Sequence, residues 1–207
     1  MTTTTYPGTV DGAEQPELML RNLRVGSRLW AASIAFFFIA FLFAFFYLRA
    51  LNSNGLWRGW AHISKTHHTS GPSPSLAFGV VILICVLASA AVARGAVLLA
   101  PALWRIAIGV SILLALAAVG LQAAQFSSLG FGPTDGGYAS VFVGWTGLFA
   151  VFLLGTVYWL GTVLGDNIRR LEIVPGLHAA SVDAVSFVLG VLALIELAAF
   201  ILLYIVA

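Results

Sequence analysis

The sequence predicts an all-α fold: a polytopic membrane bundle of five transmembrane helices, with the N-terminus inside the cell and the C-terminus outside. Composition is the first observation, because 60% of the 207 residues are hydrophobic and only 9% are charged, more apolar surface than a water-soluble domain of this size can bury. The second is the set of five apolar runs, each close to the 20 or so residues that a membrane-spanning helix needs. The positions of the basic residues are the third.

We expect the five helices at 29–48, 76–98, 104–126, 138–164 and 184–206. The first run is apolar on every side, as expected of a helix surrounded by lipid and other helices. The second becomes rich in small residues from Ala88 to Ala93, which lets helix backbones approach closely in a bilayer, and Pro101 separates it from the third. We predict that residues 1–27 are a disordered cytosolic tail without a signal peptide and that residues 28–207 form the transmembrane domain.

Orientation follows from the Lys and Arg residues that flank the runs. The N-terminal side holds seven of them: Arg21, Arg24, Arg28, Arg94, Arg105, Arg169 and Arg170. The opposite side holds three: Arg49, Arg58 and Lys65. This excess predicts that the N-terminus is inside and the C-terminus outside, which agrees with an odd number of spans. In the long connection of 49–75, Trp57 and Trp60 are expected to anchor the chain at the membrane interface.

The same residues bound the possible functions. Basic side chains lie scattered at segment ends and form no stripe, so no nucleic-acid partner is predicted. Cys85 lies within an apolar run, where a thiol usually packs as a small hydrophobe. His62, His67 and His68 form the one histidine cluster, but their spacing is not a usual ligand pattern and no Cys or Asp accompanies them. We predict a solvated loop there, and no catalytic, cofactor-binding or metal-binding residue in the chain.

Four polar residues lie in or beside the predicted spans. Glu196 is near the middle of the last run, where a charge is costly, so it is either neutral and hydrogen-bonded, or takes part in proton handling or subunit contact. Gln122 and Gln125 are three residues apart, lie on one helix face, and are expected to bond another helix. Asp135 is expected to cap the fourth helix, with contact to a partner loop as the alternative.

Several segments resemble cytochrome c oxidase subunit III. The stretch 135–149, DGGYASVFVGWTGLF, resembles that family's DG-x-YGS-x-FF…TG-x-HG-x-HV signature, and 33–49, SIAFFFIAFLFAFFYLR, resembles its SE-x-x-FF-x-x-FFWAFF helix. The segment SVDAVSFV, which begins at Ser181, resembles HFVDVVWLF, and Gly120 with Gln122 or Gln125 is similar to part of LG-x-x-F-x-x-x-Q-x-x-E. The resemblances run in the family's order from about residue 28 to the end.

The chain also departs from that family. Ile34 stands where the family has a Glu, and Phe149 and Phe152 stand where it has two histidines. Since a buried Glu needs a polar partner, loss of both sides leaves an apolar contact and no orphan charge. Ala180 and Ser181 replace a Trp-His pair. We therefore expect a divergent five-helix form, to which functions of those polar residues do not transfer.

The resemblance implies a non-catalytic subunit of a haem–copper terminal oxidase, active in aerobic respiration in a bacterial plasma membrane. Such a subunit holds no haem or copper, which belong to the catalytic partner. It packs beside subunits I and II, binds phospholipid between helix groups, and supports proton uptake and stability of the complex. The residues expected to contact lipid or partner subunits are Arg49, Asp135, Tyr138, Ser140, Thr146, Gly147, Asp183 and Glu196.

Three questions stay open at this point. The electron donor of such an oxidase is either cytochrome c or a quinol. A subunit III-like accessory protein of a nitric oxide reductase is a second reading of the same resemblance. A small proton-coupled transporter that uses Glu196 is a third, although the sequence has no inverted repeat to support it.

Overall fold

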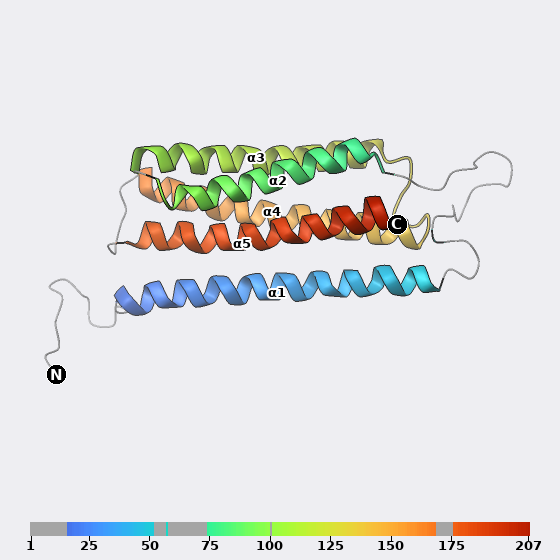
Figure 1. The fold of residues 1–207 in the computed structure, drawn as a ribbon, viewed down its shortest axis with the longest axis horizontal. Coiled ribbons are helices and arrows are strands. Elements are labelled where there is room, and N and C mark those ends of the chain that lie inside the picture. The colour runs from blue at the N-terminus through green and yellow to red at the C-terminus, as the bar shows by residue number, and fades with distance from the viewer. Residues whose placement is uncertain (1–15, 52–56, 58–73, 100, 169–175) are drawn as a thin grey trace, which may run out of the picture.

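The computed structural model describes residues 16–51, 57, 74–99, 101–168 and 176–207. Within these ranges the structure is all-helical, and Figure 1 shows five long helices that run alternately in opposite directions. They are α1 (Pro16–Ala50), α2 (Leu76–Ala96), α3 (Pro101–Ser128), α4 (Gly137–Ile168) and α5 (Leu177–Phe200), and α5 continues as a π-helix, η1 (Ile201–Val206). All five are long and apolar enough to cross a membrane, which indicates a multi-pass membrane protein.

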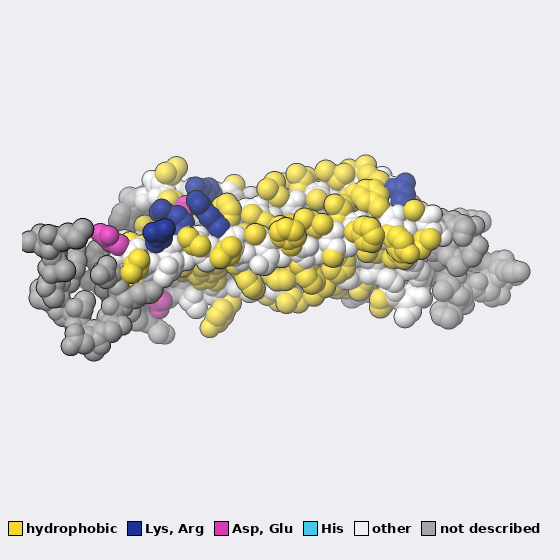
Figure 2. Space-filling model, turned by 90° about the horizontal axis from the view of Figure 1, so that it is seen from below, with side chains coloured by type: hydrophobic (Ala, Val, Ile, Leu, Met, Phe, Trp, Pro, Cys, Tyr) yellow, Lys and Arg dark blue, Asp and Glu magenta, His cyan; other side chains and the backbone are white. Residues whose placement is uncertain are grey.

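The helices form three layers. α2 and α3 pack closely together, α4 and α5 lie beneath them, and α1 lies against α4 and α5 on the far side (Figure 1). We call the end where α1 and α5 finish and α4 begins the C-terminal end of the bundle, and the opposite end the N-terminal end. Figure 2 shows an apolar surface along most of one face, with Lys and Arg gathered toward its two ends. Such a distribution is typical of a bundle that faces lipid along its middle.

Two helices begin well before the predicted spans. α1 begins at Pro16, so residues 16–27, predicted to belong to a disordered tail, are helical. Leu, Met and Arg in this segment are good helix formers, and Glu17 in the first turn complements the helix dipole. α5 begins at Leu177 instead of 184, after Gly176 in the left-handed conformation (φ 83°). Val182 and Asp183, which precede the predicted fifth span, therefore lie inside α5.

Small residues of α2 are buried at its close contact with α3, a partner helix that the sequence did not identify. Ser89 and Ser111 are both buried at this contact. The Ser89 hydroxyl lies 2.8 Å from the Ser111 carbonyl oxygen, and the Ser111 hydroxyl lies 3.0 Å from the Ser89 carbonyl oxygen. Each hydroxyl thus has a backbone acceptor on the opposite helix, which satisfies polar groups that lipid cannot.

Candidate functional site

Tyr138 is the centre of the predicted motif, and it joins three segments at the C-terminal end of the bundle. Its side chain is buried, and its hydroxyl donates to the carbonyl oxygen of Leu203 at 2.7 Å. Its backbone N–H donates to the carbonyl of Trp57 at 3.1 Å. Trp57 itself is buried and packs edge-on against Phe45 and Tyr138, so the prediction that it anchors at the membrane interface is wrong.

The residues around Tyr138 shape the turn before α4. Asp135 accepts a hydrogen bond from the Gly132 backbone N–H at 2.6 Å. This bond closes the turn ahead of the helix, so the structure does not support the prediction that Asp135 caps α4. Gly136 has a positive φ of 139°, a conformation that favours glycine. The exposed Ser140 hydroxyl lies 3.0 Å from the Gly136 carbonyl and also reaches that of Pro133.

The other two polar positions of the motif lie further along α4. Thr146 is buried, and its hydroxyl donates to the Phe142 carbonyl one turn earlier at 2.6 Å, which satisfies the group within its own helix. Gly147 faces α3, where the ring of Phe126 lies 3.9 Å from the position that a Cβ atom would occupy. Both residues therefore serve helix packing inside this chain.

Asp183 lies near the N-terminal end of the bundle and pairs with a basic residue of another helix. Its carboxylate forms an ion pair with Arg94 of α2, and the Arg94 guanidinium also reaches the Ser186 hydroxyl at 3.4 Å. Both charged side chains are exposed, so the pair contributes at most about 1 kcal/mol. At the opposite end Arg49 is exposed in the last turn of α1.

A chain of polar side chains links α3 to the end of α5. The Gln122 side-chain amide donates to Gln125 Oε1 at 3.2 Å, and Gln125 Nε2 lies 2.8 Å from the Tyr204 hydroxyl. The Tyr204 hydroxyl is also 3.0 Å from Gln125 Oε1. The prediction that these amides bond another helix is confirmed for Gln125, whereas Gln122 reaches Tyr204 only through Gln125.

Glu196 lies inside the bundle. Its side chain is 4% exposed, so it cannot reach a polar partner on another chain without rearrangement. Its Oε2 atom has no hydrogen-bond partner among the described residues. An unpaired charge would be costly in these surroundings.

The two segments that depart most from the subunit III pattern meet between α1 and α4. Ile34 and Phe149 are both buried in the same apolar core. One turn after Ile34, the ring of Phe38 lies 6.4 Å from that of Phe149 and 5.8 Å from that of Phe152. Ile34 and Phe149 thus belong to an apolar core without charge, in which the rings of Phe38, Phe149 and Phe152 pack together.

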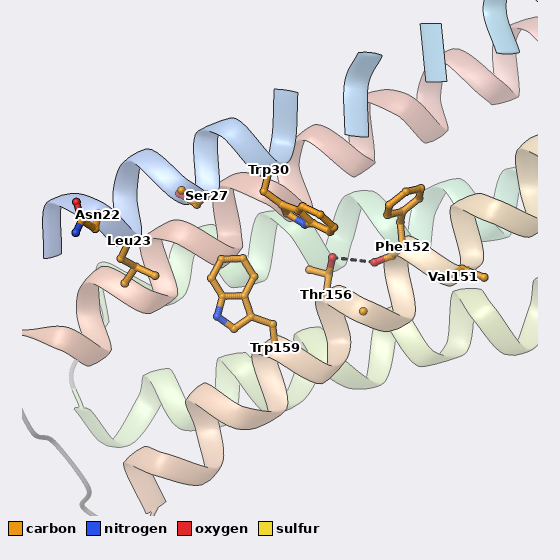
Figure 3. A pocket seen from close by; sticks show the side chains of 10 residues that line it. Asn22, Leu23, Ser27, Trp30, Val151, Phe152, Thr156 and Trp159 are labelled. Carbon is orange, nitrogen blue, oxygen red and sulfur yellow. Dashed lines mark hydrogen bonds between the residues drawn. The ribbon is translucent and has the colours of Figure 1, made fainter. Parts of the chain in front are cut away.

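Near the N-terminal end, a groove of about 680 Å³ separates α1 from α4 (Figure 3). Small residues leave the space, and two indoles, Trp30 and Trp159, lie on either side of it. The Thr156 hydroxyl donates to the Phe152 carbonyl of its own helix at 3.0 Å. Mainly apolar walls of this kind suit a hydrocarbon chain. The lining residues are Asn22, Leu23, Gly26, Ser27, Trp30, Val151, Phe152, Gly155, Thr156 and Trp159.

The structure does not gather the predicted contact residues into one site. Arg49, Asp135, Tyr138 and Ser140 lie toward the C-terminal end, Asp183 lies toward the other, and none of the eight lines the groove of Figure 3. The sequence predicted no residue of this groove, and its α1 wall, within 22–30, lies mostly in the segment predicted to be a disordered tail. Other predictions, on His62, His67, His68 and Trp60, lie outside the described residues.

Neither a scan against protein-family models nor a comparison with curated proteins gives a match to this chain. The class that the fold supports is therefore a multi-pass helical membrane protein.

Proposed function

We propose that this chain is a non-catalytic accessory subunit of a haem–copper oxidase, of the kind that cytochrome c oxidase subunit III represents. In this role it packs against the catalytic subunit I and beside subunit II in a bacterial plasma membrane. Haem and copper belong to the partner, and this chain supports proton uptake and the stability of the complex.

The observation that carries the proposal is the aromatic contact between α1 and α4. Two segments more than a hundred residues apart carry the resemblance, and their substituted positions belong to one core around Ile34, Phe38 and Phe149. In the family's pattern the positions of Ile34 and Phe149 carry a buried acid and a basic side chain, and loss of one alone would leave the other unpaired. Loss of both is compatible with the uncharged core in which Ile34 and Phe149 are buried.

The polar residues of the fourth segment agree with an accessory role. Tyr138, Asp135 and Thr146 each form a hydrogen bond within this chain that fixes the start of α4 or its packing. These residues position helices, and chemistry is left to a neighbouring subunit.

The groove between α1 and α4 supports the phospholipid part of the proposal. A lipid-facing groove in a bilayer is filled by acyl chains or by another helix, since water has few polar partners there. Arg21, Arg24 and Arg28 lie exposed on the same end of α1, within reach of an anionic headgroup.

Purification from native membranes tests the proposal. The chain, tagged at its N-terminus, is isolated in mild detergent, its visible spectrum is recorded, and the accompanying proteins are identified. We expect haem absorption and a large polytopic partner. Oxygen or nitric oxide consumption by the isolated complex then separates an oxidase from a nitric oxide reductase. A colourless protein that purifies alone would contradict the proposal.

Glu196 favours a second candidate, a small proton-coupled transporter, because one of its buried carboxyl oxygens has no partner among the described residues. Proteoliposomes containing a pH-sensitive dye test this function. In a transporter, Glu196→Gln abolishes proton flux, whereas Asp166→Asn, at an exposed position near the end of α4, leaves it unchanged. An accessory subunit gives no flux in either form.

A further inference from the structure

A second, smaller cavity lies between α1 and α5, with a volume of about 270 Å³. Its walls come from residues within 35–42 of α1 and 191–198 of α5, together with Trp145 of α4. Ile39 and Leu194 are exposed, so the cavity opens at the surface of the bundle between these two helices. The lining side chains are aliphatic or aromatic, which suits a hydrocarbon chain.

An arginine lies on the side of α1 that lines this cavity. Arg28 is seven residues before Ala35 and fourteen before Leu42, which is close to two and four whole turns of helix. It is therefore on the same side of α1 as these two lining residues, about 10 Å along the helix axis from Ala35. Its side chain is exposed and forms no ion pair with a described residue.

The pairing of helices at the cavity also shows what lies beside Arg28 on α5. α1 and α5 run in the same direction (Figure 1), and the cavity brings 35–42 against 191–198. Counting back seven residues on both helices places Arg28 at the level of Asp183. Asp183 is paired with Arg94 of α2, so its charge is compensated within this chain. The positive charge of Arg28 is left for a ligand.

Further basic and apolar surface adjoins Arg28. Arg24, one turn earlier on α1, is also exposed, and Figure 2 shows Lys and Arg side chains gathered at this end of an otherwise apolar face. On α5, the exposed Phe187 is seven residues before Leu194, so apolar surface continues from the cavity toward the arginines. A ligand that fits must carry an anionic group about 10 Å from a hydrocarbon chain. A phospholipid has this arrangement, whereas an acidic protein segment has the anion without the long chain.

We propose that this side of α1 binds one anionic phospholipid, with its phosphate at Arg24 and Arg28 and one acyl chain in the cavity between α1 and α5. Guanidinium groups donate charge-assisted hydrogen bonds to phosphate oxygens. A zwitterionic headgroup brings its own cation beside the phosphate, so the site favours a lipid with net negative charge. The site shares no lining residue with the groove of Figure 3, and it does not require the haem–copper oxidase role.

Native mass spectrometry of the full chain in mild detergent tests the headgroup. The probes are dioleoyl phosphatidylglycerol, which is anionic, and dioleoyl phosphatidylcholine, which is zwitterionic and has the same acyl chains. We expect one phosphatidylglycerol molecule to bind roughly fivefold more tightly than phosphatidylcholine. Arg28→Gln should weaken phosphatidylglycerol binding about fivefold, whereas Arg49→Gln, at an exposed position in the last turn of α1, should leave it unchanged.

A phosphatidylglycerol with a photoreactive diazirine in its acyl chain locates that chain. We expect labelling within 35–42 of α1 and 191–198 of α5. Ala198→Phe fills the cavity from its exposed side and should abolish this labelling, whereas Ala40→Phe adds the same ring at an exposed position of α1 outside the cavity and should not. Thermal unfolding of each variant shows whether the bundle is intact.

Equal affinity for the two lipids would overturn the proposal and leave the arginines to an acidic protein segment. An unchanged affinity in Arg28→Gln, or an equal loss in Arg49→Gln, would overturn it too, because the charge at this position would then have no specific role. Labelling that persists in Ala198→Phe would place the acyl chain elsewhere and contradict the site. None of these results depends on whether a haem-containing partner co-purifies.

Discussion

The Tyr138 hydroxyl shows how one side chain can fix a helix junction in an apolar chain. It crosses from the first turn of α4 to the Leu203 carbonyl in the π-helical end of α5. Both residues are fully buried in the bundle, so the bond keeps both polar groups satisfied. Interhelical hydrogen bonds in membrane proteins nevertheless contribute modestly, on average about 0.6 kcal/mol, because the unfolded chain also finds partners.

Tyr138→Phe should therefore lower the free energy of unfolding by about 1 kcal/mol without changing the fold. Titration with a denaturing detergent, followed by circular dichroism, measures the change. Tyr158→Phe is the matched control, since that ring is on the same helix but 76% exposed. An equal loss in both variants would mean that the Leu203 contact contributes nothing specific.

Single positions also mark how far the sequence could predict the site. The spacing of Gln122 and Gln125 correctly predicted an interhelical bond, because buried amides need partners. Asp135 was predicted to cap the fourth helix because Asp is a favoured capping residue, but its carboxylate accepts a hydrogen bond from the Gly132 amide in the preceding turn. The Arg94–Asp183 pair was missed because no short-range pattern joins residues on helices separated by the whole of α3 and α4.

Among the helices, the contact of α2 with the end of α5 depends on the smallest side chain. A Cβ atom at Gly79 would lie 2.7 Å from ring carbons of Tyr204, closer than atoms can pack. The Tyr204 ring cannot move away freely, because its hydroxyl is bound to Gln125 of α3. Gly79 thus allows three helices to meet around one tyrosine.

Gly79→Ala should displace Tyr204, break its bond to Gln125 and destabilise the bundle by about 1–3 kcal/mol. Gly95→Ala on the same helix has open space and should be neutral or slightly stabilising. The same detergent titration measures both variants. In a Tyr204→Leu background Gly79→Ala should lower the free energy of unfolding much less. Additive losses of stability would show that the tyrosine ring does not cause the effect of Gly79→Ala.

The boundaries of the helices were less predictable than their number. Apolar runs indicate where a helix can cross hydrocarbon, and each of the five predicted runs lies in a helix that is long and apolar enough to span a membrane. Helical structure continues beyond the apolar region in α1 and α5, where polar residues such as Arg21 and Asp183 give no hydropathy signal. The groove between α1 and α4 extends into that region, which is one reason why the sequence did not predict it.

The whole molecule has a charge asymmetry that predicts its orientation in the membrane. The N-terminal side has seven basic residues in its flanks and the opposite side has three, and such an excess is expected on the cytoplasmic side. The alternating direction of the five helices then places the two ends of the bundle on opposite sides of the membrane (Figure 1). The orientation also decides which side the groove of Figure 3 faces: with the N-terminus inside, it lies in the cytoplasmic leaflet, beside anionic lipid.

Cysteine labelling on intact cells measures this orientation directly. In a Cys85→Ser background, Ala207→Cys should react with a membrane-impermeant maleimide from outside, whereas Thr5→Cys should react only after the membrane is permeabilised. The parent Cys85 lies within α2 and should stay unlabelled in both conditions. Outside labelling of Thr5→Cys alone would reverse the orientation and move the groove to the outer leaflet. Labelling of both ends from one side would require an even number of crossings, which the five apolar helices oppose.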